Sequence, residues 1–110
     1  MARANDALQG TLDLMVLKCL AQLGSMHGFG IGLHIQRVSN DLLRVEEGSL
    51  YPALRRIEQE GWITSEWKTT ENNRRARYYR LTAAGREQLA DEERNWAKIV
   101  KGVAAVLRYA

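Results

Sequence analysis

Apolar residues recur at helical spacing near the start of the chain. A spacing of three and four positions is typical of a helix with one buried face. The positions concerned are Leu12, Met15, Val16, Cys19, Leu20 and Leu23. We expect Thr11 to cap this helix at its N-terminus, and the Gly24-Ser25 pair to end it after Leu23.

The segment HGFGIGLHIQRVSN predicts a second helix from about Gly28 to Ser39, although its three glycines are unusual inside a helix. Its buried side is expected to consist of Phe29, Leu33, Ile35 and Val38. The next segment, DLLRVE (residues 41–46), is short and could form a single-bridge strand.

Residues 46–63, EEGSLYPALRRIEQEGWI, predict a third helix with two different faces. Leu50, Leu54 and Ile57 stand at i, i+4 and i+7, so they share one face, which we expect to be buried. Pro52 fits the first turn, where backbone N–H groups have no helical partner. Gly61 is expected to end the helix in a left-handed conformation.

Two alternating segments follow and predict a β-hairpin. In GWITSEWKTT, the even-numbered residues 62–68 lie on one side and the odd-numbered residues 63–67 on the other. RARYYRL forms the second strand, and Tyr78 and Tyr79 should point to opposite faces, one to the core and one outward. The connecting TENNRR is a polar, basic turn.

Thr82 is expected to cap a last, long helix that carries an apolar seam. Leu89, Trp96 and Val103 lie seven positions apart, and Ile99 and Val106 fall between them. This seam extends past what a compact three-helix module can cover. Because a monomer does not normally leave such a stripe in water, we expect a second copy of the chain to cover it.

Three helices followed by a hairpin is the order of a winged helix-turn-helix. The predicted fold is mainly α with a small β-hairpin: a winged helix-turn-helix DNA-binding domain over residues 1–82 and a C-terminal dimerisation helix over residues 83–110. In this fold the third helix enters the major groove and the wing contacts the backbone. The outward face of the third helix would carry Tyr51, Arg55 and Gln59.

Charge supports a nucleic-acid partner. The net charge is only +3, but four arginines lie within residues 74–80. Arginine can bond guanine with two donors at once, and it neutralises phosphates. The candidate DNA-binding residues are Ser49, Tyr51, Pro52, Arg55, Arg56, Gln59, Arg74, Arg75 and Arg77. The alternatives are a solvated face for the helical arginines and a solvated turn for the wing.

Catalysis is not expected. His27, His34 and Cys19 show no metal-ligand spacing, and no nucleophile–base pair stands out, so no metal or cofactor is predicted. No segment has the length and apolar character of a membrane span or a signal peptide, so we expect a cytoplasmic protein. The remaining alternative is a winged helix that contacts only other proteins, a use in which the basic wing is typically lost.

Four segments resemble the PadR family of bacterial transcriptional regulators: GTLDLMVLKCL, HGFGIGLHI, EEGSLYPALRRIEQEGWI and RRARYYRLTAAGREQL. The resemblance covers about residues 9–107. It implies a homodimer, usually a repressor, that binds a palindromic operator in double-stranded DNA. The C-terminal helix and the partner's first helix would form the interface. By position, Tyr51, Arg55 and Gln59 match the family's recognition-helix contacts, and Ser49 and Pro52 lie in the same motif. The basic wing of the family is matched by Arg74, Arg75 and Arg77.

A single C-terminal helix resembles the short class of the family, which lacks the larger C-terminal domain of the phenolic-acid sensors. In multidrug-sensing members an aromatic residue at the position of Trp96 sandwiches flat hydrophobic ligands. Trp96 either fills the dimer core or lines a site for a small aromatic effector. The resemblance leaves these two alternatives open.

Overall fold

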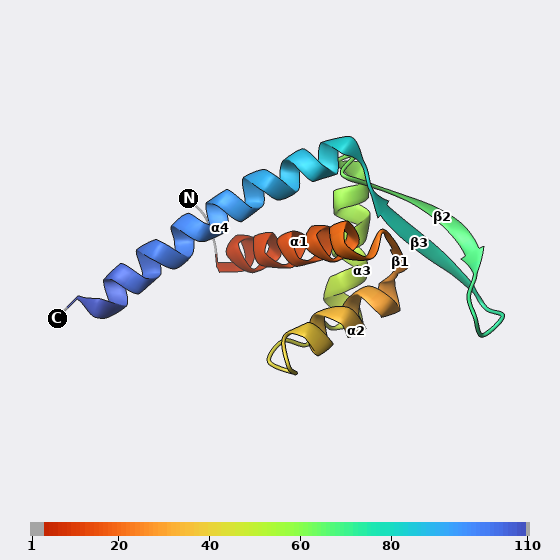
Figure 1. The fold of residues 1–110 in the computed structure, drawn as a ribbon, viewed down its shortest axis with the longest axis horizontal. Helices are drawn as coiled ribbons and strands as arrows, with labels where there is room; N and C mark the ends of the chain where they lie inside the picture. The colour runs from red at the N-terminus through yellow and green to blue at the C-terminus, as the bar shows by residue number, and fades with distance from the viewer. Residues whose placement is uncertain (1–3, 110) are drawn as a thin grey trace.

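The computed structural model describes residues 4–109, and their side chains from residue 10 onward. In this part of the chain four helices surround a small sheet (Figure 1). The elements are α1 (Ala4–Leu23), β1 (Ser25–His27), α2 (Gly28–Val38), α3 (Glu47–Gln59), β2 (Ile63–Thr69), β3 (Arg75–Leu81) and α4 (Ala83–Arg108). The β2–β3 hairpin and the C-terminal half of α4 project in different directions from the body formed by α1, α2 and α3.

The core lies where the first three helices meet the base of the sheet. Leu50, Leu54 and Ile57 of α3 are buried, as their spacing predicts. They pack in one cluster with Val16 and Leu17 of α1 and with further apolar residues of α2, β2, β3 and α4. Burial of this shared face fixes which side of α3 remains exposed to solvent.

The predicted helix ends are confirmed. Gly24 (φ 86°) follows α1, and its N–H donates to the carbonyl of Leu20 at 2.9 Å. Gly61 (φ 81°) follows α3, and its N–H donates to the carbonyl of Glu58 at 3.0 Å. Glycine suits both positions because a left-handed backbone carries no steric penalty without a Cβ. At the start of α2, His27 Nδ1 accepts from the N–H of Gly30 at 2.9 Å.

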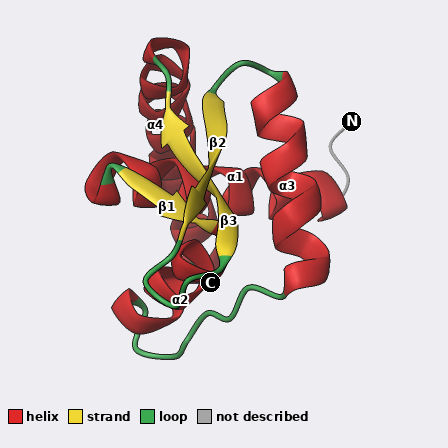
Figure 2. Cartoon of the chain, turned by 90° about the vertical axis from the view of Figure 1, so that its right-hand side faces the viewer, coloured by secondary structure: helices red, strands yellow, loops and turns green. Residues whose placement is uncertain are grey.

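The sheet is antiparallel, with strand order β1-β3-β2 (Figure 2). Across the hairpin, Trp67 is paired with Arg77 and Thr69 with Arg75. Tyr79 is the tyrosine that enters the core, whereas Tyr78 is half-buried. Because strand residues alternate between faces, Trp67, Arg75 and Arg77 lie on the same face of the wing.

Predictions about α1, the short strand and α2 are wrong in part. Helix α1 begins at Ala4, so Thr11 lies inside the helix and does not cap it. The residues before Thr11 include good helix formers, and nothing in them stops the helix. The short strand is Ser25–His27, held by pairing with β3, and residues 43–46 form no strand. Ile35 is buried as predicted, but Phe29 and Val38 are exposed, because α2 turns Ile31 to the core together with Ile35.

Helix α4 is joined to the core only through its first turns. Thr82 caps it as predicted, with its Oγ1 accepting from the N–H of Gly85 at 3.0 Å. Gly85 packs directly on the backbone before β2: a Cβ at this position would lie 1.9 Å from the carbonyl oxygen of Trp62. Leu89 is buried in the chain's own core. Further along, Lys18 of α1 pairs with Glu93 at 3.1 Å, and beyond this point α4 is largely exposed.

Candidate nucleic-acid interface

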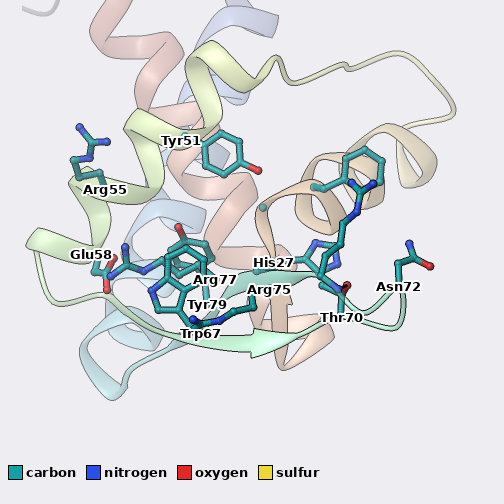
Figure 3. Close-up of a pocket in the computed structure, with 14 residues that line it drawn as sticks. His27, Tyr51, Arg55, Glu58, Trp67, Thr70, Asn72, Arg75, Arg77 and Tyr79 are labelled. Atoms are coloured by element: carbon teal, nitrogen blue, oxygen red, sulfur yellow. Dashed lines mark hydrogen bonds between the residues drawn. The ribbon is translucent and has the colours of Figure 1, made fainter.

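Helix α3 and the wing face each other across an open cleft of about 700 Å³ (Figure 3). Its walls combine cationic and aromatic side chains from the N-terminal end of α2, from α3 and from the hairpin. The lining residues from these three elements include Phe29, Tyr51, Arg55, Glu58, Trp67, Arg74, Arg75, Arg77 and Tyr79. The cleft therefore brings the predicted recognition face and the predicted wing residues into one site.

The exposed face of α3 begins with Tyr51, whose side chain is 40% exposed. Its ring lies over the first residue of α2, where a Cβ on Gly28 would be 2.7 Å from Tyr51 Cε1. A glycine in this helix, which looked unfavourable from the sequence, leaves the space that the tyrosine ring occupies. One turn further on, Arg55 is exposed and has no hydrogen bond or ion pair with any residue whose side chain is described. Its guanidinium is therefore available to a ligand.

Ser49, Pro52 and Gln59 are also exposed on α3. Ser49 lies in the first turn, where the helix dipole favours an anion. The prediction that Pro52 lies in the first turn is wrong, because Pro52 is the sixth residue of α3. Gln59 is the last residue of the helix. None of the three lines the cleft itself. They lie at the border of the exposed surface whose central residues are Tyr51 and Arg55.

Arg56 has a different position from its neighbour. Its Nη2 donates to Asp13 Oδ1 of α1 at 2.5 Å, and the two side chains are 35% and 12% exposed. Burial raises the pKa of the Asp13 carboxyl, and the nearby Arg56 guanidinium opposes that rise. Consecutive helical residues point about 100° apart, which separates the two arginines. Arg56 connects α3 to α1, and only Arg55 of the pair is kept as a candidate DNA contact.

On the wing, two arginines stack on one indole. The guanidinium carbons of Arg75 and Arg77 lie 5.5 and 5.7 Å from the centre of the Trp67 ring. Arg77 Nε also donates to Ser65 Oγ at 2.9 Å, and Ser65 Oγ donates to Glu58 Oε2 of α3 at 2.6 Å. These contacts connect the wing to α3.

The wing tip and the cleft floor are ordered by short-range contacts. The N–H of Arg74 donates to Thr70 Oγ1 at 3.2 Å, and Asn73 adopts a left-handed φ of 59°, as expected for this turn. On the floor, burial raises the pKa of the Tyr79 hydroxyl above its ordinary value of 10.0. Trp67 was not among the predicted site residues. Strand alternation predicts the face of the hairpin on which it lies, but not that this face lies opposite α3.

The predicted seam on α4 is exposed beyond its first residue. Trp96 is 43% exposed, and Ile99, Val103 and Val106 are more exposed still. Leu89 differs because it is buried within the chain, so it has little surface to offer a partner. Val100 and Leu107, which the heptad pattern did not include, are also exposed and widen the stripe.

Other kinds of site are not evident within residues 4–109. There, His, Cys, Asp and Glu do not gather in groups of three or more that could hold a metal ion. Over the same range, no helix has both the length and the hydropathy that a membrane span requires. Cys19 is a buried free thiol, as expected, and burial raises its pKa to about 11.

Three helices followed by a wing define the chain as a winged helix-turn-helix protein, as its pattern predicts. A family model described as the transcriptional regulator PadR-like family matches residues 16–91. The chain therefore belongs to this family of transcriptional regulators, whose members are regulators and not enzymes.

Solved structures and curated relatives agree with this assignment. A transcriptional regulator from Clostridium thermocellum has a TM-score of 0.80 at 28% identity, over 94% of this chain and 99% of that one. A PadR family transcriptional regulator from Eggerthella lenta has a TM-score of 0.78 at 28% identity, over 94% and 88%. Transcriptional regulator Rv3488 of Mycobacterium tuberculosis is 37% identical over 68 residues, which are 62% of this chain and 63% of that protein.

Proposed function

We propose that this chain is a sequence-specific DNA-binding regulator that acts as a homodimeric repressor on a palindromic operator. One observation carries the proposal: the free face of α3 and the basic wing line the same cleft, with Tyr51 and Arg55 on one side and Arg74, Arg75 and Arg77 on the other. Such a regulator acts in the cytoplasm, where it meets the chromosome.

In the proposed complex α3 lies in the major groove. Arg55 has free donors for a base edge or a phosphate, and Tyr51 and Gln59 flank it on the same face. Ser49 lies at the end of α3 whose dipole favours a phosphate, and Pro52 lies in the next turn. The wing arginines contact the adjacent backbone, which adds affinity without reading sequence.

A salt titration tests DNA binding. Fluorescence anisotropy of a labelled duplex should give an affinity that falls steeply as salt rises, because bound phosphates release counterions. Arg74→Ala should reduce the slope of log K against log salt by about 0.9 for each subunit, and so by about 1.8 for the homodimer, because each chain loses one phosphate contact. Arg108→Ala, at the far end of α4, is the matched control and should leave the slope unchanged. If the wild type does not bind duplex even at low salt, the proposal fails and the protein-contact alternative is favoured.

The dimer rests on the exposed stripe of α4. Replacing Ile99 and Val103 by glutamate should give monomers and abolish operator binding together, since both half-sites are needed for high affinity. Lys101→Glu introduces the same charge about 100° or more around the helix from both positions and should remain dimeric. Sedimentation measures the state, and circular dichroism checks that α4 stays helical. A stable dimer in the double variant would contradict this assignment.

The last part of the proposal is a small aromatic effector that binds at Trp96. Trp96 lies within the stripe, so a dimer formed there would place two indoles near the twofold axis, where a planar guest could stack. Titration with planar cationic dyes should quench the fluorescence of Trp96. Absence of quenching, or quenching that persists in Trp96→Ala, would remove the effector from the proposal.

A further inference from the structure

Trp67 is the exposed aromatic residue at the centre of the wing's cleft face. Its side chain is 56% exposed, so packing in the core does not account for it. In the strand register it lies directly opposite Arg77 and diagonally from Arg75, and both guanidinium groups reach its ring. The close-up shows the indole beside both arginine side chains, on the side of the hairpin that faces α3 (Figure 3).

The three candidate wing arginines are held in different ways. Arg77 stacks on Trp67 and is also hydrogen-bonded to Ser65, which is bonded to Glu58. Arg75 stacks on Trp67 but forms no side-chain hydrogen bond or ion pair with another residue whose side chain is described. Arg74 has neither kind of side-chain contact with those residues. Trp67 therefore matters most for Arg75, less for Arg77 and not for Arg74.

Ordering matters because an arginine side chain has many rotamers, and their loss opposes binding. A guanidinium that is already held over an indole has lost part of that freedom before DNA arrives. This contact does not use the guanidinium N–H groups as hydrogen-bond donors, so those of Arg75 stay available to phosphate, whereas Arg77 already donates through Nε to Ser65.

We propose that Trp67 is a positioning residue of the wing, which holds Arg75 and Arg77 in one layer so that both meet the DNA backbone in a fixed arrangement. This inference rests on the proposed DNA-binding function and deepens it. It assigns an aromatic residue, rather than a further cation, as a determinant of wing affinity.

The first test compares Trp67→Leu with Trp67→Phe. Leucine keeps an apolar side chain but has no ring face, whereas phenylalanine keeps a ring face. Ordering one rotamer-rich side chain on binding costs about two- to twelvefold in affinity. Because Trp67 orders two arginines in part, Trp67→Leu should weaken duplex binding by roughly 5- to 25-fold at each wing. Trp67→Phe should recover most of that loss. Melting curves of both variants should match the wild type, which separates positioning from folding.

A double-mutant cycle distinguishes positioning from a purely structural role. A structural role would not make the effect of Trp67 on DNA affinity depend on Arg75. If Trp67 acts through Arg75, then Trp67→Leu should weaken binding much less in an Arg75→Ala background than in the wild type. In an Arg74→Ala background, which is the matched control, the effects of the two changes should multiply.

Two outcomes overturn the inference while leaving the proposed function in place. One is wild-type affinity for Trp67→Leu although Arg75→Ala binds more weakly. The other is a loss in Trp67→Leu that is equally large with and without Arg75, because the indole would then contact DNA itself. A wild-type protein that shows no salt-dependent binding would instead refute the proposed function.

Discussion

The adjacent arginines of α3 give the sharpest test of the proposed DNA-reading face. Arg55 is exposed and lines the cleft, whereas Arg56 is bonded to Asp13 of α1 and does not line it. Changing each to alanine removes the same side chain from the same helix, so any difference in outcome comes from the face on which the residue lies. We expect Arg55→Ala to lose DNA binding and Arg56→Ala to lose stability.

The magnitudes follow from the surroundings of each residue. Removing Arg56 leaves the Asp13 carboxylate, whose side chain is 12% exposed, without its charged partner. An unsatisfied buried charged group costs about 1.5–3 kcal/mol, and the partial exposure of Arg56 favours the lower part of that range. For a chain of this length the change corresponds to a fall in Tm of roughly 5–10 °C. Arg55→Ala should stay within about 0.5 kcal/mol of the wild type, because the site is exposed and alanine is a good helix former.

The binding assay uses a duplex that the wild-type protein selects from random sequence. Loss of an arginine contact to a base or phosphate costs about 1–3 kcal/mol, so Arg55→Ala should weaken binding by roughly 5- to 150-fold. Affinity is measured by anisotropy at a temperature where both variants are folded. Replacing Asp13 and Arg56 together by leucine should recover much of the stability, since no unpaired charge then remains. The reasoning is refuted if Arg55→Ala melts early and binds normally, or if Arg56→Ala loses affinity at unchanged Tm.

The remaining predictions concern two glycines and the buried cysteine. Gly85→Ala should lower stability by about 2–3 kcal/mol, since its Cβ would overlap a backbone carbonyl, whereas Gly48→Ala on α3, with open space around it, should not lower Tm in thermal melting. Gly28→Ala should displace Tyr51 and weaken duplex binding in the anisotropy assay, with Tm near that of the wild type. Burial raises the pKa of Cys19 from 9.0 to about 11, so the unfolded chain releases this proton first. Wild-type stability should therefore fall relative to Cys19→Ala as pH rises from about 9 to about 11, and urea titrations at a series of pH values would detect this.

Periodic features could be predicted from the sequence, because each extends over several turns or residues. The buried face of α3 needs only the spacing of Leu50, Leu54 and Ile57, and the hairpin needs only alternation and a polar turn. Strand β1 has three residues, too few to show an alternating pattern. It forms because it pairs with the edge of β3.

The site was predictable only in part, because local spacing does not reveal long-range partners. Arg55 and Arg56 look alike in the sequence, and it is Asp13, 43 positions before Arg56, that separates their roles. Trp67 is similar: its importance depends on the register with the second strand, which pairs it with Arg77. Once that register is known, the two arginines next to Trp67 on the other strand are enough to identify it as a candidate site residue.

Helix α4 is one continuous rod of 26 residues, attached to the core at its first turns and bearing the apolar stripe on its other half. Each residue advances the helix by about 1.5 Å and turns it by about 100°. Inserting one residue between Leu89 and Trp96 would rotate the stripe away from its present direction. Seven inserted residues would nearly restore that direction, about 10 Å further out. In the proposed dimer, the length of this rod would set the phase and separation of the two winged domains, and with them the spacing of the half-sites that a pair of chains can occupy at once.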